Sequence, residues 1–184
     1  MIICLTETWA RDDIHDDVLS LDGYVLIIRK DRKDTCMGFG GGILVYASDA
    51  LNAEEDSDFQ GGNFNQAVCL KVKTRGSNIR IVTVYRSPNS NSANNAALEQ
   101  IIRSTCSQTI LVGDFNYRCI DWDKHVASDS LGRLFLEACD DAFLTQHVHF
   151  PTRKQNVLDL ILTVNPELIG NVRTTGSLAI ATIA

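Results

Sequence analysis

Short apolar runs, separated by residues that favour turns, follow one another along the chain. Eight of these runs are rich in β-branched or aromatic residues and are bounded by Gly, Asn, Asp or Ser, which is typical of short β-strands. The predicted strands are residues 2–5, 24–28, 42–47, 67–73, 79–85, 109–113, 143–148 and 158–163. Between the fourth and fifth runs, Gly76, Ser77 and Asn78 predict the turn of a β-hairpin.

Two other segments have the apolar spacing of amphipathic helices. Residues 95–103 carry apolar side chains at i, i+3 and i+4, and Asn94 is the candidate N-cap. Residues 129–139 carry one apolar stripe, with Ser128 or Asp129 as the cap. The sequence therefore predicts two helices set between strands.

The composition fits one folded domain over residues 1–184, because 45% of the residues are apolar and 22% are charged. Residues 51–66 are acidic and rich in Gly and Asn, which predicts a loop. Strands with a few helices between them predict the α+β class. No apolar run approaches the roughly 20 residues that span a bilayer, and the first residues lack a secretion signal. We expect a nuclear or cytoplasmic protein with no membrane partner.

Cysteine usage and charge narrow the functional classes. The six cysteines are scattered and form no C-x-x-C pair, so we expect reduced thiols rather than a disulfide scaffold. The net charge is -6 at pH 7. Passive nucleic-acid binders are usually basic, because neutralising phosphates drives their binding. The charge argues against such a module and leaves open an enzyme that meets nucleic acid through a local patch and a metal ion.

A carboxylate and a carboxamide follow the sixth predicted strand in the segment Gly113-Asp114-Phe115-Asn116. In extended chain Asp114 and Asn116 would point the same way. A carboxylate there can act as a general base or hold a water, and an amide can donate to a phosphate without changing charge. The alternative is ordinary turn chemistry, since Gly, Asp and Asn are common turn residues at strand ends.

Four more side chains are candidates for phosphate chemistry. Glu7 follows the first strand and could be a hard oxygen ligand for Mg²⁺, or it could simply be a solvated loop residue. Tyr85 and Arg86 end the fifth strand, where a hydroxyl beside a guanidinium suits a phosphate oxygen; the alternative is an aromatic that closes a strand. Asp159 lies in an apolar strand and needs a histidine or metal partner unless its side of the strand is solvated.

Taken in order, five stretches resemble the endonuclease/exonuclease/phosphatase superfamily, and most of all the apurinic-type endonuclease domain of non-LTR retrotransposons. The stretches are LTETW, GGGILVYA, VYRSPNS, VGDFNYRCIDWD and FPTRKQNVLDLIL, and the resemblance runs from about residue 2 to residue 172. It implies a four-layered α/β sandwich, with two mostly antiparallel sheets face to face and helices outside. It also implies phosphoester hydrolysis with a divalent cation.

The resemblance implies a role for each matching residue. Glu7 would bind Mg²⁺ or Mn²⁺, and Asp114 would position or deprotonate the attacking water. Asn116 would hold the phosphate and Tyr85 would contact it. Asp159 would orient the catalytic histidine of the family.

The sequence departs from the family at both ends. An asparagine-bearing first strand would precede Met1, and the Ser-Asp-His ending is replaced by GSLAIATIA, so we expect an incomplete sandwich and a poor enzyme. Residues 178–184 can be encoded by bases that spell Gly-Asn-Ser-Asp-His-Ser in another frame, and we hypothesise a displaced reading frame. Sequencing the locus tests this.

Three functions remain open at this stage. The leading one is a Mg²⁺-dependent, DNA-nicking endonuclease module of a non-LTR retroelement. In that family a reverse transcriptase follows on the same polypeptide, and here the chain stops before one could begin. The alternatives are a catalytically inactive remnant and a phosphatase acting on inositol lipids or nucleotides.

Overall fold

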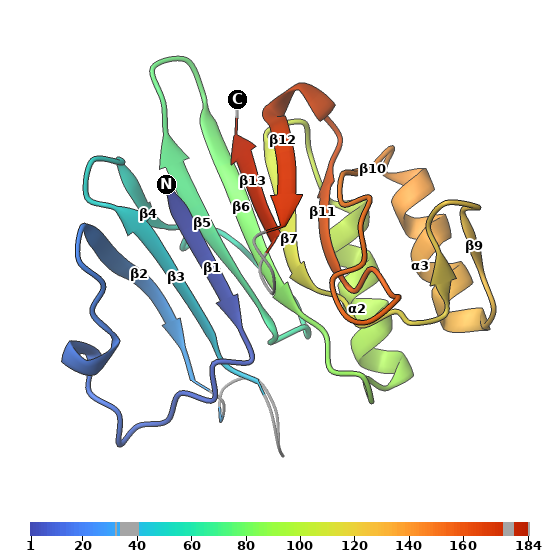
Figure 1. Cartoon of the computed structure of the whole chain (residues 1–184), viewed down its shortest axis with the longest axis horizontal. Helices are drawn as coiled ribbons and strands as arrows, with labels where there is room; N and C mark the ends of the chain where they lie inside the picture. The colour runs from blue at the N-terminus through green and yellow to red at the C-terminus, as the bar shows by residue number, and fades with distance from the viewer. Residues whose placement is uncertain (32, 34–40, 175–178, 184) are drawn as a thin grey trace.

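A six-stranded sheet lies at the centre of the computed structural model, which describes residues 1–31, 33, 41–174 and 179–183 (Figure 1). The strand order is β10-β11-β7-β6-β5-β4. Strands β6 and β7 run parallel, with helix α2 between them in sequence, and the other neighbours are antiparallel. The strands are β4 (Ala53–Glu55), β5 (Ala67–Lys73), β6 (Asn78–Tyr85), β7 (Thr109–Asp114), β10 (Thr145–Gln146) and β11 (Asp159–Thr163).

A second layer of strands covers one face of this sheet (Figure 1). It contains a three-stranded sheet in the order β1-β3-β2 and a separate pair, β12-β13. The strands are β1 (Ile2–Thr6), β2 (Tyr24–Lys30), β3 (Ile43–Ser48), β12 (Ile169–Thr174) and β13 (Ala179–Ile183). Ile43, Val45 and Leu70 fill the core between the three-stranded and central sheets, and Ile161 and Ile169 belong to a smaller core beside β12.

Two helices pack on the opposite face of the central sheet. They are α2 (Ser92–Arg103) and α3 (Ser130–Asp141), and beside α3 lies a small hairpin of β8 (Ile120–Asp121) and β9 (Val126–Ala127). Leu98, Ile102 and Phe135 of the helices join Leu111 and Leu160 of the sheet in the largest core. Their burial removes apolar surface from water, which stabilises this layer.

A thinner layer lies outside the three-stranded sheet. It includes the 3-10 helix η1 (Asp16–Leu19), and the Tyr46 hydroxyl of β3 donates a hydrogen bond to the Leu19 carbonyl at 2.8 Å. The predicted α+β sandwich, with two mostly antiparallel sheets face to face and helical segments outside, is therefore confirmed.

The predicted strand over residues 143–148 is too long, because only β10 forms there. The amides of Phe143 and Leu144 donate to the carbonyls of Asp140 and Cys139, so the chain is still leaving α3 at this point. Phe143 has a φ of 54° and is 80% exposed. An aromatic residue favours a strand prediction, but Phe143 lies outside β10 and packs on no strand that the structure describes.

The predicted loop over residues 51–66 contains β4, which pairs with residues 70–72 of β5 at the sheet edge. The strands β8, β9, β12 and β13 and the 3-10 helices η1 and η2 (Pro166–Leu168) were not predicted either. A three-residue strand such as β4 depends on the pairing that a neighbour offers more than on its own residue preferences. The remaining predicted strands and the β5–β6 hairpin are confirmed.

Helix α2 begins earlier than predicted, at Ser92, and its cap is Asn91 instead of Asn94. The Asn91 side chain accepts a hydrogen bond from the Asn94 amide at 2.8 Å. For α3, the structure selects Asp129, whose Oδ1 accepts from the Gly132 amide at 2.8 Å.

The thiol prediction holds where it can be examined: Cys4, Cys69, Cys106, Cys119 and Cys139 are free, and Cys36 lies outside the described residues. Residues 178 and 184 of the predicted frame-shifted tail also lie outside them. Of the helices in the described ranges, none has the length and apolar character needed to cross a membrane.

Candidate active site

Three predicted site residues form a row across neighbouring strands. Tyr85 ends β6 and pairs in register with Asp114 at the end of β7, which in turn pairs with Asp159 at the start of β11. Side chains at paired positions of adjacent strands project on the same face of a sheet. The register therefore gathers a phenol and two carboxylates at one edge of the central sheet.

Glu7 reaches the same edge from the other sheet. It follows β1, and its Oε1 accepts a hydrogen bond from the Tyr85 hydroxyl at 2.6 Å although 78 residues separate the two in sequence. The structure thus brings Glu7, Tyr85, Asp114 and Asp159 together, as the sequence predicted.

Gly113 explains why this edge is so tightly built. Its φ is 134°, and a Cβ atom added to it would lie 1.9 Å from the carbonyl oxygen of Val84 on β6. Only glycine permits that approach of two backbones. The glycine before Asp114 is thus required to bring the ends of β6 and β7 together.

Asp114 carries the strongest electrostatic perturbation of the site. It is 7% exposed, and burial followed by the charge of Asp159 and then that of Glu7 raises its pKa to about 7, against the opposing effects of the Asn116 amide and Arg153. A carboxyl group that titrates near neutral pH can accept a proton and release it again. This is the property that a general base needs.

Asn116 lies beside Asp114 in a turn, so the expected extended geometry of the pair is wrong. Its φ is 53°, and its amide donates to Asp114 Oδ1 at 3.0 Å. Its Nδ2 donates to the Arg86 carbonyl at 2.9 Å, whereas Oδ1 is buried with no hydrogen-bond partner among the described residues. Asn116 is therefore both a turn residue and a candidate ligand, through Oδ1, for the predicted cation.

Arg86 is placed differently from a residue that faces substrate. It is 4% exposed, and its Nε donates to Asn95 Oδ1 of α2 at 2.8 Å. Its Nη1 donates to the carbonyls of Phe115 and Asn116, and the guanidinium lies 4.0 Å from the ring centroid of Tyr117. These contacts fix the loop after β7; phosphate binding by Arg86 stays a prediction that they do not support.

The backbone around Glu7 is held in an uncommon conformation. Glu7 and Trp9 have φ values of 54° and 56°, in the left-handed region that non-glycine residues rarely occupy. The amides of Thr8 and Trp9 donate to the carbonyls of Gly42 and Gly41. Gly42 lies so close that a Cβ there would be 2.5 Å from Thr8 Oγ1. Such strain persists only where the surroundings enforce it.

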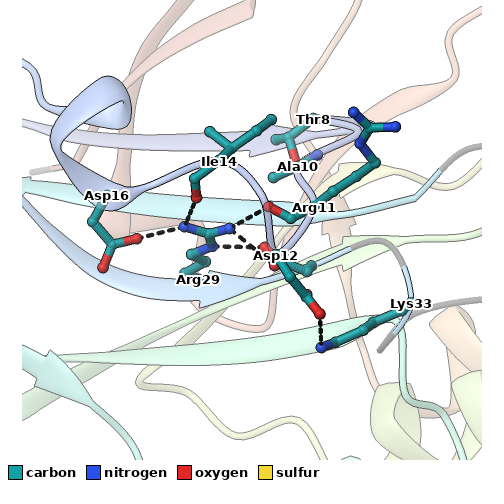
Figure 2. A network of polar contacts seen from close by, with 9 residues as sticks. Thr8, Ala10, Arg11, Asp12, Ile14, Asp16, Arg29 and Lys33 are labelled. Atoms are coloured by element: carbon teal, nitrogen blue, oxygen red, sulfur yellow. Dashed lines mark hydrogen bonds and ion pairs between the residues drawn. The ribbon is translucent and has the colours of Figure 1, made fainter.

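Arg29 of β2 fastens the segment that follows Glu7, as Figure 2 shows. Its guanidinium donates to the carbonyls of Arg11 and Ile14 and to the carboxylates of Asp16 and Asp31, at distances from 2.6 to 3.0 Å. The carboxylates hold the pKa of Arg29 above its usual range. The guanidinium thus ties the β1–β2 connection to the sheet that carries Glu7.

The donor set suits a hard cation that keeps part of its water shell. In the described part of the chain, no group of three or more His, Cys, Asp or Glu residues is arranged to hold a metal ion by itself. Mg²⁺, however, is usually held by one or two carboxylates together with waters. Glu7, Asp114 and Asp159 supply oxygen atoms whose charges repel one another, and Asn116 Oδ1 is a buried acceptor without a partner. These residues fit the predicted cation.

One neighbour of the site was missed by the sequence interpretation. Arg153 is exposed, lies in the turn before β11 and is near enough to lower the pKa of Asp114. The only sequence signal was its place in the stretch FPTRKQN, where it looks like an ordinary turn cation.

The sequence and the fold both match known proteins. The endonuclease-reverse transcriptase family matches residues 79–178, more than half of the chain. No curated protein matches. The endonuclease domain of TRAS1, a telomere-specific non-LTR retrotransposon, superposes with a TM-score of 0.57 at 17% identity, covering 82% of this chain and 69% of that one.

Two further solved structures share the fold. The 3'-5' exonuclease NExo from Neisseria meningitidis has a TM-score of 0.59 at 18% identity, covering 94% of this chain and 80% of that one. An AP endonuclease from Archaeoglobus fulgidus has a TM-score of 0.59 at 12% identity, with 93% and 79% covered.

Proposed function

We propose that this chain, which belongs to the endonuclease-reverse transcriptase family of the endonuclease/exonuclease/phosphatase superfamily, hydrolyses phosphodiester bonds of DNA with the help of a divalent cation. In this proposal it is the DNA-nicking module of a non-LTR retroelement. The observation that carries the proposal is the Tyr85–Asp114–Asp159 row, in which a buried carboxyl titrates near neutral pH beside Glu7.

The reaction can be assigned to the residues of the row. Asp114 accepts a proton from the water that attacks the phosphorus atom; the bond from phosphorus to the leaving sugar oxygen breaks, and that oxygen takes a proton from solvent. Its ordinary pKa would make it too weak a base, and burial beside Asp159 corrects this. When the cation occupies the Glu7 carboxylate, the Tyr85 hydroxyl can turn its hydrogen from Glu7 to a non-bridging oxygen of the phosphate. The second hydrogen of Asn116 Nδ2, beside the one given to the Arg86 carbonyl, can be donated to another of these oxygens, where negative charge develops.

The proposed cation is Mg²⁺ or Mn²⁺, held by Glu7 with the other oxygen atoms of the site nearby. It would supply positive charge next to the phosphoryl oxygen. Glu7 is suited to this role because the Tyr85 hydrogen bond orients its carboxylate toward the row.

A catalytically inactive remnant is the second candidate, and one observation favours it. Among the residues that the structure describes, no side chain hydrogen-bonds the carboxylate of Asp159, which the family resemblance pairs with a histidine. Loss of one catalytic group of this kind typically costs about 10²–10⁴-fold in rate.

A plasmid-nicking assay separates these functions. We expect supercoiled DNA to be converted to the nicked form with Mg²⁺ or Mn²⁺ and to stay intact with EDTA. Failure to nick with either cation would favour the inactive remnant. Release of phosphate from a soluble inositol phosphate or a nucleotide, without nicking, would instead identify a phosphatase.

A further inference from the structure

The turn that precedes β11 is a tight hairpin. The amide of Arg153 donates to the Asn156 carbonyl at 3.1 Å, and the amide of Asn156 donates back to the Arg153 carbonyl at 3.0 Å. Lys154 at its tip has a φ of 57°, the left-handed conformation that closes such turns. The backbone conformation at Arg153 is therefore fixed by the hydrogen bonds of this turn.

This hairpin is fastened directly to the candidate site. The Thr152 hydroxyl accepts hydrogen bonds from the amides of Leu158 and Asp159, at 3.0 and 3.1 Å. Asp159 is the residue that pairs with Asp114. The position of Arg153 is thus coupled to the carboxylate row through two short contacts.

An anionic substrate would need a positively charged side chain close to this acidic site. Glu7, Asp114 and Asp159 would repel a phosphodiester, and the chain as a whole carries a net charge of -6. The buried guanidinium of Arg86 already donates hydrogen bonds to other groups of the protein. Arg153 is exposed, and its guanidinium makes no side-chain hydrogen bond or salt bridge among the described residues, although its charge acts on Asp114.

We propose that Arg153 binds a backbone phosphate of the DNA that occupies this site, with its planar guanidinium gripping two phosphate oxygens. This inference rests on the proposed function for the identity of the substrate. A guanidinium is pre-organised for such two-point contacts, whereas a lysine offers only a point charge. The positive charge of Arg153 thereby offsets the negative charge of the carboxylate row, and the contact fixes which phosphate of the DNA strand lies over Asp114.

The test compares Arg153→Gln with Arg75→Gln, which removes the same charge at an equally exposed hairpin. Arg75 lies in the β5–β6 turn at the opposite end of β6 from Tyr85. Duplex binding is measured by fluorescence anisotropy from 50 to about 200 mM salt, with Ca²⁺ in place of Mg²⁺. One lost phosphate contact lowers the slope of log Kd against log salt by about 0.9.

A set of duplexes, each with one neutral methylphosphonate, then locates the contact. We expect one position at which the neutral group weakens binding by the wild type and not by Arg153→Gln, while Arg75→Gln behaves as the wild type. An unchanged salt slope together with no such position would overturn the proposal. If such a position is found but the protein does not nick DNA, the phosphate contact of Arg153 is supported and the proposed function is not. If the protein nicks DNA but no such position is found, the proposed function is supported and the phosphate contact is not.

Discussion

At the residue scale, Asp114 concentrates the properties of the site. Its carboxyl is buried at a point where two other acidic groups approach, and Gly113 beside it leaves no room for a Cβ atom against the Val84 carbonyl. A charge in this position costs stability unless it is compensated. The same arrangement that makes Asp114 a useful base therefore strains the fold.

The stability cost of Asp114 depends on pH in a definite direction. Its pKa rises from 3.8 to about 7 on folding, so the folded state holds the proton more tightly than the unfolded state. The contribution of this one group to stability is therefore greatest below about pH 4 and is lost as the pH rises to 7. With EDTA present, Asp114→Asn should raise the free energy of unfolding at pH 8 by about 2–4 kcal/mol and change it little at pH 4. Urea unfolding at both pH values measures this, and an equal gain at both would contradict it.

The hydrogen bond between Tyr85 and Glu7 joins the two sheets at the site. Tyr85→Phe removes the donor and leaves a half-buried carboxylate short of a partner, which should cost about 1.5–3 kcal/mol. Tyr46→Phe is the matched control, because its hydroxyl donates to a neutral carbonyl, and it should cost about 0.5–1.5 kcal/mol. Urea unfolding compares them, and a larger loss for Tyr46→Phe would refute the charged contact.

The residues of the row could be predicted from sequence because each stands at a strand end within a recognisable stretch. The alignment of these residues across the strands could not be predicted, since it depends on how β11 pairs with β7, which is distant in sequence. The contacts of Arg86 could not be predicted for the same reason: neither Asn95 nor the carbonyls that accept its hydrogen bonds are adjacent to it in sequence. Arg153 was missed because exposure and proximity to Asp114 are properties of the fold.

At the element scale, Arg86 joins β6, helix α2 and the loop after β7. Arg86→Lys keeps the charge but loses the fork of donors and the stacking on Tyr117, so we expect a loss of about 2–3 kcal/mol. Arg153→Lys, at an exposed position, should stay within about 0.5 kcal/mol of the wild type. Thermal or urea unfolding measures both, and similar losses would contradict the assignment.

The caps of the helices show what local pattern can and cannot decide. Both helices were predicted, since the apolar spacing is strong, but the choice between Ser128 and Asp129 required the geometry. Asp129→Ala should cost about 1 kcal/mol because the Gly132 amide loses its acceptor. Ser128→Ala should be nearly neutral. The order of the two denaturation midpoints checks this, and a larger effect at Ser128 would show that the helix starts elsewhere.

At the scale of the whole molecule, the alternation of apolar runs and turns is enough to predict the α+β class, whereas the two-sheet sandwich was predicted from the family resemblance. The pattern misses β4, which pairs with β5, and β12 and β13, which pair with each other, and the aromatic residue after α3 is exposed. Net charge is equally limited as a guide. An acidic chain can still present a single guanidinium at the edge where three carboxylates meet.

The most direct test of the account is the rate at which Asp114→Asn nicks supercoiled DNA at pH 8 with Mg²⁺, measured beside the wild type. The wild type should nick the plasmid. The variant, although the more stable protein in EDTA, should lose about 10²-fold or more in rate, because the amide cannot accept the proton of the attacking water. Nicking by Asp114→Asn at the wild-type rate, or no nicking by the wild type, would contradict the claim that this carboxylate row hydrolyses DNA.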